Sequence, residues 1–152
     1  MVDANILFAA VGWKRWPYYV LKHAAAGDYQ LVLSQRIIDE ATEEVATKFP
    51  DQAGQFRRLL VSLKPEIVPE PSDKQLARNR NLLRDREDVP IALAVINARV
   101  DYFVSEDKHF TDKSQQTATL HRRLSIMLSG TFLREVMKWT SEQLQAIRAQ
   151  DR

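Results

Sequence analysis

The sequence predicts an α/β fold, a three-layer sandwich in which helices flank a short, mostly parallel sheet. Two observations favour this class. Short, continuously apolar runs such as those within 29–33 and 102–105 have the length and composition of buried strands. Longer runs with helical periodicity lie between them, and strands that alternate with helices are typical of parallel sheets covered on both faces.

Length and composition are those of one globular domain. At 152 residues, 45% hydrophobic and 28% charged, the chain can bury a core of its own. No repeat or long linker divides it, so we expect a single domain over 1–152, with a core over 1–138 and a final helix over 140–150. The absence of cysteine excludes disulfides and thiolate metal sites and favours a reducing compartment. Because we find neither a targeting segment nor a long apolar span, we expect a cytoplasmic location.

The expected strands are short apolar runs bounded by polar or turn-forming residues. The first apolar run lies over 6–11 with Val2 before it, so we expect the first strand within the segment MVDANILFAA, with Asp3 in it or at its end. The others lie at 29–33, 67–68, 102–105 and 124–128. The strand at 67–68 lies within a proline-rich and otherwise irregular connection over 65–73.

The expected helices lie between these strands, at about 17–26, 34–49, 52–63, 73–83, 89–100, 131–138 and 141–149. Several of their ends carry clear signals. Pro17 suits the first turn of a helix, and Gly27 can end it. Ser34 is a favourable N-cap, and Pro50 stops the helix that Ser34 begins.

Four acidic residues fall where a parallel sheet gathers its functional groups, outside the carboxyl ends of the strands. Asp107 follows the 102–105 strand, and Asp88 opens the apolar helix that precedes that strand. Glu40 lies in the second turn of the helix that Ser34 caps, and Asp3 lies in or at the end of the first strand. We therefore expect the four side chains to converge on one edge of the sheet.

Helical geometry selects Glu40 from the four acids of its helix. The apolar stripe of this helix consists of Ile37, Ile38, Ala41 and Val45. At 100° per residue from Ile37, Glu44 falls at about −20° and Glu40 at about −60°, beside the stripe. Asp39 and Glu43 fall on the opposite face and should be solvated. Glu40 and Glu44 can face a half-buried cleft, and Glu40 is nearer the end of the strand.

Each acid also has a simple structural explanation. Asp88, with Pro90 just after it, could be a helix cap. Asp107 could belong to an Asx-turn, and Glu40 could be an ordinary exposed residue. Asp3 is harder to explain, because a carboxylate beside a buried strand is costly unless it is paired or bound to a metal. The convergence of all four acids therefore favours function more than any one of them does.

A divalent cation would resolve the repulsion among converging carboxylates, which would otherwise hold protons. Mg²⁺ and Mn²⁺ prefer oxygen ligands, and such a site binds phosphates and supports phosphodiester cleavage without a histidine or cysteine nucleophile. The acids therefore predict a Mg²⁺ or Mn²⁺ site with phosphodiesterase chemistry.

Two basic clusters could contact an anionic partner, which the net charge of +2 permits but does not require. Lys14 and Arg15 lie among aromatic residues within 13–19. The second cluster lies in the approach to the acidic segment around Asp88 and consists of Arg78, Arg80, Arg84 and Arg86. Cations of this kind bind phosphates and aromatic rings stack on bases, so both clusters are candidate nucleic-acid contacts. The alternative is a solvated charged face with the aromatic residues in the core.

Taken together, the segments resemble the PIN-domain nucleases, and among them the VapC-like toxin ribonucleases and their close relatives. The matching segments are MVDANILFAA, LSQRIIDE, DREDVPIALA, VSEDKHF and LSGTFLREV. They occur in family order and cover about 1–138. Each fragment is weak alone, but together and with compatible spacing they form a strong match.

The resemblance implies a metal-dependent endoribonuclease with a PIN-like sandwich. It assigns catalysis and the binding of Mg²⁺ or Mn²⁺ to Asp3, Glu40, Asp88 and Asp107, with Asn5 and Ser105 as supporting polar groups. It further implies an RNA substrate held in part by the two basic clusters. The role of toxin in a toxin–antitoxin pair, an antitoxin protein as partner and a homodimer follow from the resemblance alone.

The chain departs from the family pattern at three points. It starts two residues before Asp3, so the first strand should be shorter than in the family. Ala4 stands where a hydroxyl residue is common, which removes one hydrogen bond behind the site. His109 stands where another acid is often found, which would weaken the binding of a second metal.

Other functions fit less well. The nearest alternative is a catalytically silent PIN-like module that binds RNA or a protein, against which the intact acids argue. A haloacid-dehalogenase-type phosphatase needs a second aspartate where this chain has Asn5. A metal-free ribonuclease needs two converging histidines, whereas the histidines here come from scattered segments: His23, His109 and His121. A response-regulator receiver would need an acidic pair at the first strand and an aspartate after the third.

Overall fold

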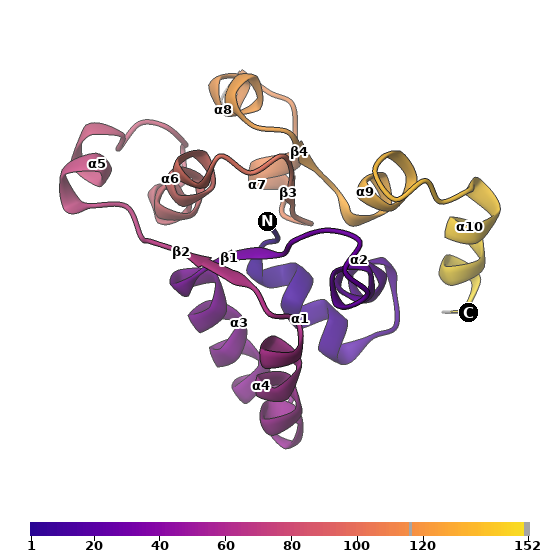
Figure 1. Cartoon of the computed structure of the whole chain (residues 1–152). Coiled ribbons are helices and arrows are strands. Elements are labelled where there is room, and N and C mark those ends of the chain that lie inside the picture. Colours follow the sequence, from indigo (N-terminus) through magenta and orange to yellow (C-terminus); the bar gives the residue numbers. More distant parts are fainter. Residues whose placement is uncertain (116, 151–152) are drawn as a thin grey trace.

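The computed structural model describes residues 1–115 and 117–150 and shows a helix-rich α/β fold with short parallel strands (Figure 1). Within these residues the strands pair in parallel as β1 (Val32–Ser34) with β2 (Glu66–Val68) and β3 (Phe103–Val104) with β4 (Ile126–Met127). Val2 adds an isolated parallel bridge to Val104. The predicted fold class, short parallel strands flanked by helices, is confirmed.

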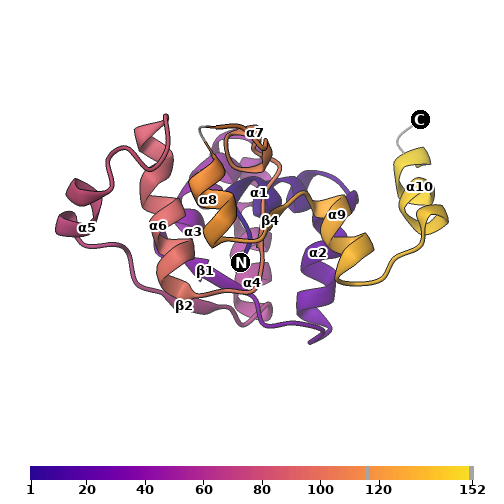
Figure 2. The same ribbon diagram turned by 90° about the horizontal axis from the view of Figure 1, so that it is seen from above.

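The described helices cover both sides of these strands. They are α1 (Ala4–Gly12), α2 (Trp16–Ala25), α3 (Gln35–Lys48), α4 (Ala53–Ser62), α5 (Asp73–Arg78), α6 (Val89–Ala98), α7 (Lys108–Thr111), α8 (Ala118–Arg123), α9 (Ser129–Glu135) and α10 (Ser141–Ala149), with short 3-10 helices η1 (Pro50–Gln52) and η2 (Arg86–Asp88). In Figure 1, α3 and α4 lie below β1 and β2, whereas α6 to α9 lie above them. Figure 2 shows α6 on one side of β4 and α9 and α10 on the other. None of the described helices combines the length and apolar character that crossing a membrane requires.

The segment that follows Asp3 is helical rather than extended. The sequence places MVDANILFAA at the first strand, but only Val2 pairs with a neighbouring strand, and α1 begins at Ala4. Asp3 starts the helix because its Oδ1 accepts a hydrogen bond from the Ala4 N–H at 2.8 Å. Ile6 and Ala10 are buried one helical turn apart, so the apolar run forms a helix face rather than a strand.

The remaining differences from the sequence-based expectations have local causes. β1 starts at Val32 rather than near 29, because Tyr29 packs edge-on against Phe132 and donates its hydroxyl to the Val20 carbonyl at 2.7 Å. α5 ends at Arg78, well before 83, and the backbone of the following residue, Asn79, is no longer helical. The sequence analysis assigned no element to 108–123, where α7 and α8 are too short to show a helical period.

α6 is apolar on nearly all sides because other parts of the chain cover it. Its buried residues are Val89, Ile91, Ala92, Leu93, Ala94 and Val95. A helix that is hydrophobic all round belongs in the interior of a protein. α6 therefore anchors η2 and its acids at one end and leads into buried β3 at the other.

Gly130 gives a prediction about packing. Alanine would normally stabilise a helix by about 1 kcal/mol relative to glycine. A Cβ at Gly130 would lie only 2.8 Å from Cε3 of Trp16, so we expect Gly130→Ala to lower the free energy of unfolding, by about 1–3 kcal/mol. Urea unfolding checks this, with Gly54→Ala as control, since a Cβ at Gly54 would meet only the flexible end of Arg58, at 3.6 Å. An unchanged or higher stability of Gly130→Ala would show that Trp16 can move aside freely.

Candidate metal centre

Asp3 is a buried carboxylate at the junction of α1 and β3. Its N–H donates to the Val104 carbonyl at 2.9 Å, which fixes the backbone beside β3. The side chain is held at both oxygens, since Oδ1 accepts from the Ala4 N–H and Oδ2 accepts from the Ser105 hydroxyl at 2.7 Å. Burial raises the pKa of Asp3 from about 3.8 to about 6, against the lowering effect of these hydrogen bonds.

Asn5 and Ser105 connect Asp3 to the loop that follows β3. The Ser105 hydroxyl donates to Asp3 and accepts from the Asp107 N–H at 3.0 Å and from Asn5 Nδ2 at 3.3 Å. Asn5 Nδ2 also lies 3.3 Å from Asp3 Oδ2, and its Oδ1 accepts from the Glu106 N–H at 3.1 Å. This network uses the full hydrogen-bonding capacity of the serine hydroxyl. It positions Asp3 and the backbone of Asp107 relative to each other.

Asp107 and Asp88 face His109 from two different elements. Asp107 begins α7, where its Oδ1 accepts from the His109 N–H at 2.9 Å, so one oxygen does make the predicted turn contact. Asp88 precedes α6 but makes no side-chain cap bond to it; its Oδ2 lies 3.2 Å from His109 Nδ1. The Asp88 side chain is 16% exposed. Its role in this structure is therefore not that of a helix cap.

The electrostatics of Glu40 place it with the other acids. Burial raises its pKa first, and Asp3 and Asp88 raise it further, while Arg36 lowers it. The pKa of Asp88 is also raised, by burial and then by Asp85 and Asp107. Repulsion by Asp107 and Asp88 also raises the pKa of Asp3, after the effect of burial. The four predicted acids are therefore close enough to repel one another when ionised.

The other acids of α3 lie as the helical geometry predicts. Asp39 and Glu43 are exposed, and Glu44 is half-buried and pairs with Lys48 at 3.0 Å. Glu40 is more exposed than a half-buried cleft would make it. It lies at the edge of the buried stripe, so its carboxylate stands at the rim of the site.

Two further residues join the site that sequence reasoning did not select. His109 Nδ1 lies 3.2 Å from Asp88, 3.7 Å from Asp107 and 3.9 Å from Asp85. The hydrogen bond that the His109 ring donates to the Asp88 carboxylate is the largest cause that raises the pKa of His109. Asp85, Asp88 and His109 offer ligand atoms that all lie within 4.8 Å of one another. The signal available in the sequence was the short spacing: Asp85 precedes Asp88 by three residues, and His109 follows Asp107 by two.

The donor set fits a hard divalent cation. Among the described residues, no hydrogen bond engages Asp88 Oδ1, Asp107 Oδ2 or either carboxylate oxygen of Glu40. Carboxylate oxygens are the ligands that Mg²⁺ and Mn²⁺ prefer, and a cation would offset the repulsion that raises the pKa values. Asp3, Glu40, Asp88 and Asp107 could hold such an ion, while Asp85 and His109 form an overlapping set that shares Asp88.

The candidate basic residues divide among several surfaces. Arg84 and Arg86 line a hollow of about 510 Å³ together with Asp88 and His109. Arg15 lines a second hollow beside Glu106, and Lys14 lines a third between α1, α2 and α4. Arg78 and Arg80 are exposed at and just beyond the end of α5, and neither lines the hollow that contains Asp88. The structure therefore brings Arg84 and Arg86 next to the acids but not the whole arginine cluster.

The fold and the acids together define an α/β protein with a carboxylate site of the kind that holds a divalent metal. A family model described as a PIN domain matches residues 1–109, well over half of the 152-residue chain, so this protein belongs to the PIN-domain family. PIN domains are generally nucleases and typically use divalent metals, which gives the chain a nuclease-type function. The matched range contains all four predicted acids. Comparison with curated proteins and with solved structures finds no match.

Proposed function

We propose that this protein is a Mg²⁺- or Mn²⁺-dependent endoribonuclease that hydrolyses RNA phosphodiester bonds. The proposal is supported by Asp3, Glu40, Asp88 and Asp107: burial is the main cause that raises the pKa of Asp3, Glu40 and Asp88, and repulsion by neighbouring carboxylates adds to it. Buried, neighbouring carboxylates are unfavourable when they are ionised without a cation. A function that needs a bound cation accounts for their presence together.

Each residue has a defined task in this proposal. A divalent cation held by the four carboxylates would neutralise charge at a phosphodiester and lower the pKa of a water molecule. Ser105 and Asn5 keep the Asp3 carboxylate in place by hydrogen bonds at 2.7 and 3.3 Å. Arg84 and Arg86, beside Asp88, are suited to contact the phosphates of the RNA strand.

The biological role proposed here is that of the toxin in a toxin–antitoxin pair, with an antitoxin protein as inhibitor and a homodimer as the assembly. Family resemblance supports this part of the proposal. Induced expression of the wild-type chain should then slow bacterial growth, while expression of Asp88→Asn should not. Equal growth of both strains at equal protein levels would remove the toxin role and leave the nuclease to be tested on its own.

The direct test is cleavage of a panel of structured and single-stranded RNAs by purified protein. Each reaction contains Mg²⁺, Mn²⁺ or EDTA, and RNA and single-stranded DNA of the same sequence are compared. We expect cleavage of RNA with either metal and none with EDTA. Intact RNA under every metal condition, from protein whose melting temperature does not respond to Mn²⁺, would contradict the proposal and favour the silent binding module.

A further inference from the structure

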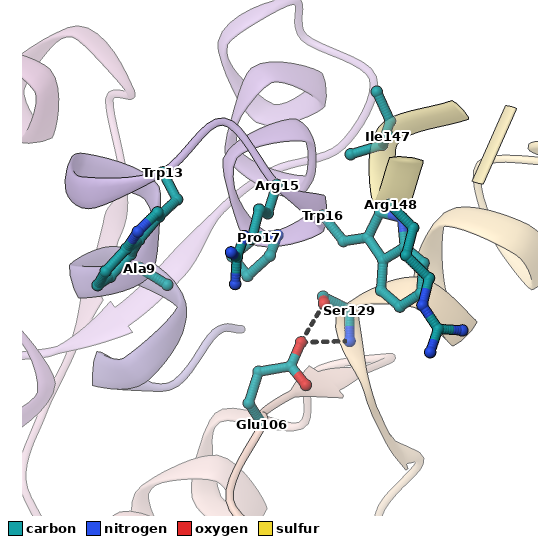
Figure 3. Close-up of a pocket in the computed structure, with 9 residues that line it drawn as sticks. All are labelled: Ala9, Trp13, Arg15, Trp16, Pro17, Glu106, Ser129, Ile147 and Arg148. Carbon is teal, nitrogen blue, oxygen red and sulfur yellow. Dashed lines mark hydrogen bonds between the residues drawn. The ribbon is translucent and has the colours of Figure 1, made fainter. Parts of the chain in front are cut away.

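A second hollow opens beside Glu106, in the loop that follows β3. It measures about 560 Å³ and lies between the end of α1, the start of α2 and the first turn of α9, with α10 at its edge (Figure 3). Glu106 forms part of its wall and stands between Ser105 and Asp107 in the chain. We call this hollow the Trp13 pocket.

Aromatic packing holds Trp13 in place at the surface. Its side chain remains 45% exposed although it makes edge contacts with Phe8 at 6.2 Å and Phe49 at 5.8 Å between ring centres. Phe8 and Phe49 are themselves stacked at 5.4 Å, so the ring rests on a rigid support. An exposed tryptophan held in this way is pre-positioned for stacking on a flat ligand, with little ordering cost on binding.

Arginine side chains give the pocket a positive lining. The Arg15 guanidinium carbon lies 5.9 Å from the centre of the Trp13 ring. Arg148 of α10 lines the pocket as well, and Figure 3 shows Trp16 beside it. A neighbouring hollow of about 270 Å³ shares Trp16, Glu106 and Arg148 and adds Arg134. Cations from three segments of the chain, Arg15, Arg134 and Arg148, therefore line these two hollows and could contact phosphates.

Glu106 distinguishes this pocket from a simple phosphate site. Its Oε1 accepts hydrogen bonds from both the N–H, at 3.2 Å, and the hydroxyl of Ser129, which lock the carboxylate against the start of α9 (Figure 3). A fixed carboxylate repels a bare anion but accepts hydrogen bonds from the amino group of a base such as cytosine. An apolar peptide helix would desolvate Glu106 and the arginines without pairing them, so it fits less well.

We propose that the Trp13 pocket binds one nucleotide of single-stranded RNA next to the bond that is cut. Its base stacks on Trp13 and presents an amino group to Glu106, and Arg15 and Arg148 contact the adjoining phosphates. This inference rests on the proposed ribonuclease function, since the pocket would then hold the strand beside the acids. The combination of stacking surface, cations and a base-reading carboxylate defines the substrate class as unpaired RNA.

The test measures binding of a fluorescein-labelled single-stranded RNA octamer by anisotropy in EDTA, where cleavage cannot occur. We expect Trp13→Ala to weaken binding on the order of 10-fold or more, because stacking of a base on an aromatic ring is lost. Trp13→Phe keeps an aromatic ring and should restore most of the affinity. Arg148→Glu, at an exposed position, should weaken binding and flatten its dependence on salt, whereas the exposed control Arg123→Glu on α8 should have a smaller effect.

A walk with abasic nucleotides locates the contact. Wild-type protein should lose affinity at one abasic position, and Trp13→Ala should show no further loss at that position.

RNA binding by Trp13→Ala and Arg148→Glu that equals wild-type binding would overturn the inference, even if the protein cleaves RNA. Binding that depends on Trp13 without cleavage under any metal would support the pocket and reject the nuclease. Trp13-dependent binding of a protein partner, with RNA binding unchanged, would likewise overturn the inference.

Discussion

Asp88→Asn should reduce RNA cleavage by at least about 100-fold and leave the fold intact. Residues that merely support a metal ligand contribute about 10- to 100-fold to affinity or activity, and a ligand should contribute no less. Asparagine keeps the size of the side chain but loses the charge. Asp88 makes no cap bond to α6, so the helix loses nothing with it, and the raised pKa of Asp88 shows that its ionised form is disfavoured without a cation.

Control variants separate the loss of a ligand from a general change of charge. Asp51→Asn removes an exposed acid from η1 and should retain full activity. Asp85→Asn tests the overlapping set that contains His109, and a smaller loss than in Asp88→Asn would assign the ion to the four predicted acids. Initial rates at saturating Mg²⁺, together with circular dichroism spectra, measure both effects. Full activity in a folded Asp88→Asn protein would show that this carboxylate is not needed for catalysis.

In the metal-free protein, Asp3→Asn should gain stability relative to the wild type as the pH rises toward neutral, while removing activity. The folded-state pKa of Asp3 is raised from 3.8 to about 6, so the folded protein binds more protons than the unfolded chain between these values. Ionisation of Asp3 therefore lowers the stability of the wild type as the pH rises through this window. A shift of about two pKa units corresponds to about 3 kcal/mol, and Asn avoids this loss because it carries no charge.

The measurement is the difference in unfolding free energy between wild type and Asp3→Asn in EDTA, from pH 4 to pH 7.5. The difference is needed because burial lowers the pKa of the Met1 amino group to about 5, which makes stability rise with pH in both proteins. We expect the stability of the variant minus that of the wild type to increase by about 2–3 kcal/mol from pH 4 to pH 7.5, and Mn²⁺ to lower this difference at pH 7.5 by stabilising the wild type. A difference that stays constant with pH would contradict the raised pKa.

Much of the fold could be predicted because its signals are local. Ser34 does cap α3, accepting from the Ile37 N–H, and the apolar stripe of α3 is buried as its spacing requires. The first segment was harder, because ILFAAV is apolar enough for either a strand or a helix. The cap bond from Asp3 and the single bridge at Val2 decide for the helix, and both depend on where β3 lies. Short α7 and α8 carry no periodic signal at all.

The candidate site divides in the same way. The four acids could be selected from strand ends and helix starts, since parallel strands bring their carboxyl ends together. The contributions of His109 and Asp85 to the site could not be predicted, because they depend on how η2 and α7 pack against each other. The Trp13 pocket joins α1, α2, α9 and α10, so its cations and its carboxylate come from distant segments of the chain. Aromatic and basic residues near 13–16 gave the only local signal for it.

The most direct test of the central claim is titration of Mn²⁺ into wild type, Asp88→Asn and Asp51→Asn at pH 7.5, followed by electron paramagnetic resonance. Binding of Mn²⁺ broadens and removes the signal of the free ion, so the measurement needs no knowledge of the RNA target. If the converging carboxylates hold a divalent cation, wild type and Asp51→Asn should bind Mn²⁺ equally well and Asp88→Asn at least about 10-fold more weakly. Equal binding of Mn²⁺ by all three proteins, or binding by none, would contradict the claim that these carboxylates hold a divalent cation.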